Sequence, residues 1–227
     1  MQIKIDLKIF LFLLIFFLTK QIEIYILFMI FAILHEFGHL IIGILLRFKP
    51  QGINLIPMGV SIRFSADCKE YSKSVKILNI KKLLIVIGGP IVNFLIAIFF
   101  IFFNIELFEF LREKIIYVNL IIGIFNLIPI YPLDGGRIVR CIVHLRKNLI
   151  YSYKYTNMIS NFTLIILTAI SSIAILYFKN LSILFIIIYL WILLIRENRI
   201  YNHKMKLYKL IKDIEKNEEM FEYDIKV

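Results

Sequence analysis

The chain has 227 residues, of which 60% are hydrophobic, and its mean hydropathy is +0.84. Soluble globular domains contain roughly half apolar residues, so this composition argues against a soluble domain and predicts an all-α polytopic membrane protein. The formal net charge of +11 would suit a nucleic-acid partner. However, no basic patch interleaved with aromatic residues supports that class, and we predict that the protein binds no nucleic acid.

Apolar stretches recur along the chain, and a helix needs about 20 mostly apolar residues to cross a bilayer. We predict about six transmembrane helices, of which the first and last are short. They cover residues 5–18, 22–46, 83–103, 115–130, 158–178 and 181–194. No small-x-small cleavage site follows the first stretch, so we interpret it as a span and not as a signal peptide.

The distribution of positive charge predicts the orientation. With the N-terminus inside, 23 of the 27 basic residues fall on the inner side, as the positive-inside tendency requires. We therefore expect a multi-pass integral membrane protein with both termini on the cytosolic side. Cys68 and Cys141 would then lie in a reducing compartment, where disulfides rarely persist.

Two domains are predicted, a six-span membrane domain over residues 1–196 and a charged cytosolic tail over residues 197–227. Between the second and third spans, residues 52–64 contain glycines and alternate in part between apolar and polar side chains. This pattern predicts a small membrane-associated β-hairpin or edge strand, and a plain interfacial loop is the alternative. Apolar residues at helical spacing over residues 207–214 predict a short C-terminal cytosolic helix, either amphipathic or simply solvated.

The second predicted span contains the sequence HEFGH at residues 35–39. His35 and His39 stand four residues apart, so they project from one helix face and can bind one metal ion together. Catalytic zinc sites usually have three protein ligands and one water, so a third ligand is needed from elsewhere. Ionisable residues inside a membrane are costly and usually functional, which makes a chance occurrence of this motif a poor explanation.

The best candidate for the third ligand lies at the inner end of the fourth predicted span, where residues 126–137 read NLIPIYPLDGGR. Pro129 and Pro132 cannot continue a regular helix. Irregular backbone is tolerated in a membrane only where protein or water buries it. Asp134 can then reach the metal, although it can instead cap a helix that begins at Gly135.

Three motifs in this order resemble the site-2 protease family of intramembrane zinc metalloproteases, peptidase family M50B. They are HEFGH, GGPIVN at residues 88–93 and NLIPIYPLDGGR, and the resemblance covers roughly residues 25–145. The compact layout without a PDZ domain is most similar to the stage IV sporulation protein FB group, which cleaves a sporulation sigma-factor precursor. That group often carries a CBS domain, for which the short tail predicted here has no room.

The resemblance implies one zinc ion per chain, with His35, His39 and Asp134 as ligands and Glu36 as the catalytic acid/base. It implies substrate contacts by a further set of residues, which are Asn126, Pro132, Gly135 and Asn93. The other two matching positions of the third-span motif, Gly88 and Pro90, are interpreted as helix-packing residues.

The implied function is intramembrane zinc metalloendopeptidase, hydrolysing a peptide bond in or near the membrane segment of a regulatory protein. A membrane-associated sigma-factor precursor is the expected substrate, and membrane-embedded inhibitory or regulatory partners are expected. Because a helical carbonyl is shielded from attack, an unwound substrate that pairs with an edge strand in residues 55–64 would be favoured. Zinc would lie roughly 10 to 16 Å below the inner surface.

Three alternatives stay open. A housekeeping site-2 protease would cleave an anti-sigma factor or signal-peptide remnants. A non-catalytic membrane scaffold would tolerate loss of Glu36, so the presence of Glu36 favours catalysis. A metal transporter would need an ion path open to both sides, and the sequence shows no second polar cluster within its predicted spans.

Overall fold

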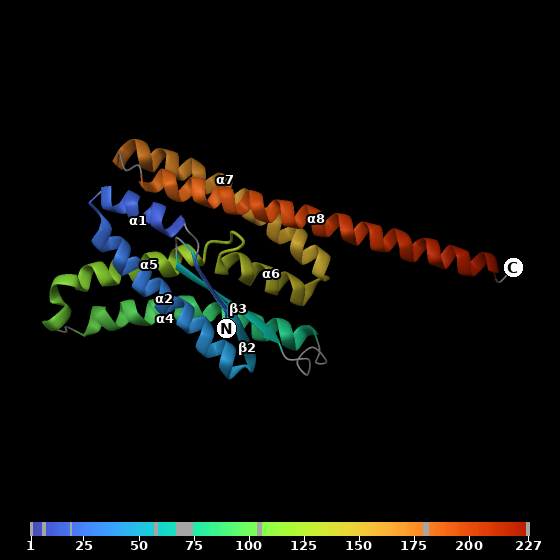
Figure 1. Cartoon of the computed structure of the whole chain (residues 1–227), viewed down its shortest axis with the longest axis horizontal. Coiled ribbons are helices and arrows are strands. Elements are labelled where there is room, and N and C mark those ends of the chain that lie inside the picture. Colours follow the sequence, from blue (N-terminus) through green and yellow to red (C-terminus); the bar gives the residue numbers. More distant parts are fainter. Residues whose placement is uncertain are drawn as a thin grey trace.

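Helices form most of the architecture in the computed structural model (Figure 1), which describes residues 2–5, 8–18, 20–56, 59–66, 75–103, 106–178 and 182–225. The N-terminal part contains β1 (Gln2–Ile5), α1 (Lys8–Leu18), α2 (Ile22–Leu45), β2 (Phe48–Ile56) and β3 (Gly59–Ala66). The remainder contains α4 (Val75–Phe102), the 3-10 helix η1 (Glu106–Leu111), α5 (Arg112–Asn126), α6 (Asp134–Arg146), α7 (Leu149–Phe178) and α8 (Ser182–Ile225).

Helices α2, α4 and α5 pack against one another, and α2 carries the HEFGH segment. The approach of α2 to α4 is close because two glycines face each other. A Cβ atom on Gly38 would collide with the Gly88 carbonyl oxygen and would lie 2.8 Å from a methyl of Val92. Small residues thus let the two helices meet backbone to backbone. Beside this contact an apolar cluster joins α2 to α5, and its buried members are Phe31, Ile115, Val118 and Ile122.

Helices α6, α7 and α8 form a second group. In Figure 1, α7 and α8 run side by side, and α8 continues well beyond the rest of the molecule. Their contact is held by a buried apolar cluster that also includes the turn before α6, with Ile130, Leu164, Ile187, Leu190 and Leu194 as its members. This cluster anchors the turn that carries the predicted third metal ligand.

The three strands form one sheet in the order β1-β2-β3. β2 and β3 are antiparallel, with a register that runs from Phe48 opposite Ala66 to Ile56 opposite Gly59, and β1 lies parallel to β2. The sheet contacts α2. Gly43 permits part of this contact, because a Cβ atom there would come within 2.9 Å of Phe64 ring carbons.

The prediction of six spans differs from the structure. Among the described residues, three helices are long and apolar enough to cross a membrane, namely Ile22–Leu45, Lys76–Phe102 and Leu149–Tyr177. Of the predicted first span, residues 5–18, only Ile5 lies in β1, and the rest of its described residues form the 11-residue α1. The predicted fourth span is the 15-residue α5 followed by an irregular turn. Both helices are shorter than the roughly 20 residues that a full span needs.

The predicted last span and the predicted tail helix are one continuous helix. α8 has 44 residues, and its sequence contains neither glycine nor proline, the residues that most readily end a helix. The expected domain boundary at residues 196 and 197 therefore lies inside α8. The charged residues Arg196, Glu197 and Arg199 follow its apolar half directly.

Candidate metal centre

Three side chains predicted as metal ligands meet at one buried point. His35 and His39 of α2 and Asp134 of α6 are 3 to 4% exposed. The two Nε2 atoms lie 3.2 Å apart, and Asp134 Oδ2 lies 2.9 Å from His35 Nε2 and 3.1 Å from His39 Nε2. All three candidate ligand atoms lie within 4.8 Å of one another. The structure thus joins the HEFGH and LDGG segments, which are 95 residues or more apart in sequence.

Asp134 reaches this point because of the turn that precedes it. α5 ends at Asn126, residues 127–133 are irregular, and α6 begins with Asp134. A Cβ atom on Gly135 would overlap the carbonyl oxygens of Leu127 and Ile128, so only glycine lets the first turn of α6 pack against this segment. The N-cap position is occupied by Leu133, so helix capping is not the role of the Asp134 carboxylate.

A chain of buried amides fixes the protonation of His35. The carbonyl oxygen of Ile115 only accepts, so Asn119 donates to it through Nδ2 at 2.9 Å. Asn119 Oδ1 then accepts from Asn93 Nδ2 at 2.9 Å, and Asn93 Oδ1 faces His35 Nδ1 at 2.5 Å. Nδ1 of His35 therefore carries the proton, and the lone pair of the ring lies on Nε2.

His39 Nδ1 lies 2.8 Å from the carbonyl oxygen of Ile85, which can only accept, and 3.2 Å from the backbone nitrogen of Gly89. The shorter contact requires the proton on Nδ1, as in His35. Both rings thus direct unprotonated Nε2 atoms at each other and at the Asp134 carboxylate. Three lone pairs then meet, with no proton between the two nitrogens. A cation resolves this repulsion, and two imidazoles with one carboxylate form a ligand set that suits zinc. The Nδ1 partners are the outer hydrogen bonds that orient such ligands.

Gly89 of α4 leaves the space beside these ligands. A Cβ atom at this position would lie 2.5 Å from Nε2 of both His35 and His39. No side chain larger than hydrogen fits there without displacing the imidazoles. The GGP segment of α4 thus contributes room to the site, in addition to the close helix packing at Gly88.

Glu36 follows His35 on α2 and is half-buried. Its carboxyl group is within electrostatic reach of His35, His39 and Asp134, and also of Arg137. Arg137 extends from the next turn of α6, with Nη1 3.7 Å from Asp134 Oδ1. A carboxylate beside three convergent ligands is the arrangement that a general acid/base of a metallohydrolase requires.

The predicted substrate contacts have different surroundings. Asn93 is fully buried and hydrogen-bonded to His35 and Asn119, so the structure places it behind a ligand. Asn126 is half-buried and donates to the carbonyl oxygen of Ile122 in its own helix. Pro132 is half-buried in the turn before Asp134, and Gly135 is buried in the first turn of α6.

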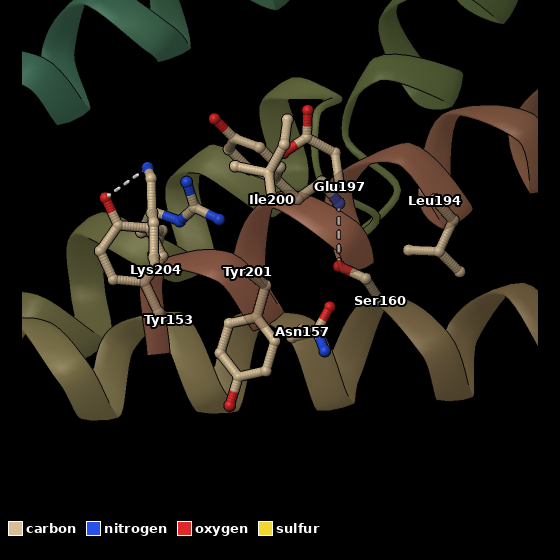
Figure 2. Close-up of a pocket in the computed structure, with 10 residues that line it drawn as sticks. Tyr153, Asn157, Ser160, Leu194, Glu197, Ile200, Tyr201 and Lys204 are labelled. Carbon is tan, nitrogen blue, oxygen red and sulfur yellow. Dashed lines mark hydrogen bonds between the residues drawn. The ribbon is translucent and has the colours of Figure 1, made fainter. Parts of the chain in front are cut away.

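Two further features escaped the sequence analysis. Asn119 supports the amide chain, and its only signal in the sequence is a polar residue in the predicted span 115–130. Behind the turn lies a polar cluster, which we call the Arg140 cluster (Figure 2), formed by Tyr131, Arg140, Tyr153, Ser160 and Lys204. It lines a cavity of about 30 Å³, which is room for a single water molecule.

In the Arg140 cluster, positively charged groups lie over aromatic rings. The Arg140 guanidinium carbon is 3.5 Å from the centre of the Tyr131 ring and 4.5 Å from that of Tyr153. Ser160 Oγ accepts a hydrogen bond of 2.9 Å from the backbone nitrogen of Tyr131. The turn that presents Asp134 to the histidines is therefore also held by contacts with α6 and α7.

Comparisons with known proteins agree with this geometry. A model of the Peptidase family M50 matches residues 23–116 and 104–170, which together span residues 23–170. A zinc metalloprotease of Methanocaldococcus jannaschii is 33% identical over 136 residues, which are 58% of this chain and 37% of that protein. The matched part thus spans little more than a third of this relative.

The fold is also similar to a solved structure, a site-2 protease from Methanocaldococcus jannaschii. The TM-score is 0.62 at 26% sequence identity, and the match covers 86% of this chain and 89% of the solved chain.

Proposed function

The chain belongs to the peptidase family M50, and on that basis we propose that it is a zinc-dependent intramembrane endopeptidase with one zinc ion per chain. The observation that carries this proposal is the convergence of two unprotonated Nε2 atoms and one carboxylate oxygen at a buried point beside Glu36. His35, His39 and Asp134 would hold the metal. The chemistry supplied by bound zinc is Lewis acidity, which polarises a peptide carbonyl and acidifies water.

The remaining steps belong to the residues of the chain. Glu36 takes a proton from the attacking water and passes it to the leaving amine nitrogen. Asn93 and the Ile85 carbonyl oxygen hold the two imidazoles in the tautomer that leaves Nε2 free. Asn126 at the end of α5, Pro132 in the turn and Gly135 in the first turn of α6 are proposed to contact the substrate backbone.

We propose that the substrate pairs with the sheet before cleavage. β3 pairs with β2 on one side and contacts α2, the helix that carries the histidines. An extended segment added to the other edge of β3 would have no internal helical hydrogen bonds to shield its carbonyls. Proline substitutions from Val60 to Phe64, which remove backbone donors, are expected to lower cleavage; unchanged cleavage would exclude this edge as the docking site.

The proposed physiological substrate is a membrane-associated sporulation sigma-factor precursor, held under control by membrane-embedded partners. The support is the order of the three motifs and the short connection between α2 and α4. Residues 46–74 join these helices, and this segment is shorter than the roughly 50 residues of the smallest ordinary domains, so no PDZ domain is inserted there.

The test compares the wild type with Glu36→Gln, each reconstituted with a tagged sigma-factor precursor or with a tagged anti-sigma factor. Zinc is counted by elemental mass spectrometry. We expect the wild type to bind one zinc and to cleave the precursor, and Glu36→Gln to retain zinc while cleavage falls by about 10²- to 10⁴-fold. Removal of zinc with a chelator should abolish cleavage, and added zinc should restore it.

The two substrates distinguish the proposed function from its alternatives. Cleavage of the anti-sigma factor alone would support the protease and reject the sporulation substrate. Equal cleavage by the wild type and Glu36→Gln would remove Glu36 from the mechanism. Zinc bound without cleavage of any membrane substrate would favour the scaffold or transporter alternatives.

A further inference from the structure

A second, larger cavity of about 510 Å³ lies between the beginning of α4, the connection from α6 to α7, and α8. It is lined by Lys76 and Asn79 of α4, by His144 of α6 and by Lys147 of the connection. None of the metal-centre residues lines it. Its volume falls in the range of roughly 300 to 1,000 Å³ that small-molecule sites occupy.

The polar groups of this cavity are mainly hydrogen-bond donors and positive charges. Lys76 and Lys147 are exposed, and none of the described residues that line the cavity carries a carboxylate. Lys147 Nζ lies 3.4 Å from the Tyr155 hydroxyl oxygen and 4.6 Å from the centre of the Tyr155 ring. This contact orients the ammonium group and leaves it further N–H donors, since a lysine has three.

His144 adds a neutral donor to the cavity. Burial, and then the positive charge of Lys82, lowers the pKa of His144 below its usual range. Its Nδ1 is 2.8 Å from Asn79 Nδ2, so it accepts from this amide and the ring proton resides on Nε2. Two ammonium groups, an imidazole N–H and an amide suit an anion that accepts several hydrogen bonds, and they oppose a cation.

The position of the cavity indicates where such an anion comes from. Lys76 is the first residue of the membrane-span candidate Lys76–Phe102, and Leu149, which also lines the cavity, is the first residue of Leu149–Tyr177. The cavity therefore opens at the level where two apolar helices begin, which is the level of lipid headgroups. Leu149 and Ile150 provide apolar lining on the same side.

We propose that this cavity binds the phosphate group of an anionic ligand, either an acidic phospholipid headgroup or a soluble phosphate ester. Lys76 and Lys147 pair with the phosphate charge, and the His144 imidazole N–H donates to it. The site is independent of the metal centre and of the proposed proteolysis. It would link the end of α6, the helix that begins with Asp134, to the beginning of α4.

The test uses the full chain purified in detergent, with phosphatidylglycerol, phosphatidylcholine and glycerol phosphate as the probes. Binding is measured by titration with native mass spectrometry. The site variant is Lys76→Gln with Lys147→Gln. The control variant is Lys154→Gln with Lys206→Gln, which removes the same charge from exposed positions on α7 and α8 outside the cavity.

We expect phosphatidylglycerol or glycerol phosphate to bind at least about tenfold more tightly than phosphatidylcholine. The site variant should weaken this binding by about 25-fold, or about fivefold per lysine, and the control variant by less than about twofold. Lysine-dependent binding of phosphatidylglycerol alone would identify a lipid headgroup, and equal competition by glycerol phosphate would identify a soluble ester.

Two results would overturn the proposal. One is an equal loss of binding in the site and control variants, which would show attraction to the basic surface as a whole. The other is no preference for either phosphate probe over phosphatidylcholine. Zinc content, measured in parallel, shows whether each variant is folded.

Discussion

Two polar clusters include or border the turn at residues 127–133, and they differ in the kind of charged groups that they bring together. In the metal centre, Nε2 of His35, Nε2 of His39 and Oδ2 of Asp134 point at one spot. In the Arg140 cluster, the protein brings its own positive charges, because Arg140 and Lys204 both lie over the ring of Tyr153. The first cluster brings lone pairs together, whereas in the second, cations lie over aromatic rings, and Glu197 lines the same cavity.

The difference explains why the two clusters have different roles although they are neighbours. Lone pairs that converge without a proton between them are stable only around a cation supplied from outside. Cations that lie over aromatic faces are attracted by the negative face of the ring, and each such contact stabilises the fold by about 0.5 to 2 kcal/mol. We infer that the candidate metal centre needs a bound metal ion and that the Arg140 cluster has a structural role. The following variants test this inference.

The largest effect is expected at Asp134. Asp134→Asn removes the only negative charge among the three converging ligands. Zinc affinity should fall by more than about 100-fold, the upper end of what loss of an outer hydrogen bond costs, and cleavage should be lost. Competition with a zinc-sensitive dye measures the affinity. Retention of wild-type affinity would show that Asp134 is not a ligand.

Gly89→Ala should be nearly as damaging. Its methyl group would lie 2.5 Å from both Nε2 atoms, so the imidazoles must shift, and misplacement by about 1 Å can cost about 10²-fold in rate. We expect kcat/KM to fall by about that factor. The control is Gly123→Ala, whose methyl group would meet ring atoms of Phe94 at 3.1 Å; a ring can move aside, so a loss below about threefold is expected.

Asn119→Ala tests the amide chain behind His35. Without Asn119, the Asn93 amide loses the partner that fixes its orientation toward His35. Zinc affinity should fall by about tenfold, the low end for outer hydrogen bonds. Asn126→Ala is the matched control, because the Asn126 amide donates within its own helix. It should leave zinc affinity unchanged and lower kcat/KM if Asn126 contacts the substrate.

The smallest effect on zinc is expected in the Arg140 cluster. Arg140→Gln removes the guanidinium that stacks on Tyr131, and the free energy of unfolding should fall by about 1 to 2 kcal/mol. Zinc affinity should change by less than about threefold. Chemical denaturation and dye competition on the same preparations compare the two quantities. A zinc defect larger than that of Asn119→Ala would contradict the division between the clusters.

The sequence predicted that His35 and His39 come together as candidate metal ligands, because a helix fixes their i, i+4 geometry by itself. Asp134 was predicted because ionisable candidates near the spans are scarce and because two prolines interrupt the helix before it. The position of Asn93 behind His35 was not predicted, since it depends on a hydrogen bond between residues 58 positions apart. Arg140 was overlooked because its partners, Tyr131 and Tyr153, lie on either side of it in segments whose contact no local pattern encodes.

The fold was predicted more accurately for helices than for spans. Hydropathy identified the apolar stretches, but it did not show that α5 ends at Asn126 or that β1 leaves α1 with only 11 residues. These limits arise from the proline-rich turn and from pairing of β1 with β2, which is a contact between residues about 50 positions apart. The continuity of α8 was foreseeable, because no helix-breaking residue occurs within it.

Because α8 is uninterrupted, its length can be calculated from its number of residues. At about 1.5 Å per residue, its 44 residues extend about 66 Å. Lys204 contacts Tyr153 of α7, and Tyr208 lines the larger cavity. The 17 residues from Lys209 to Ile225 extend about 25 Å further. As Figure 1 shows, this end stands clear of the other helices. A helix of this length holds its C-terminal end at a fixed distance from the helices that carry the candidate metal centre.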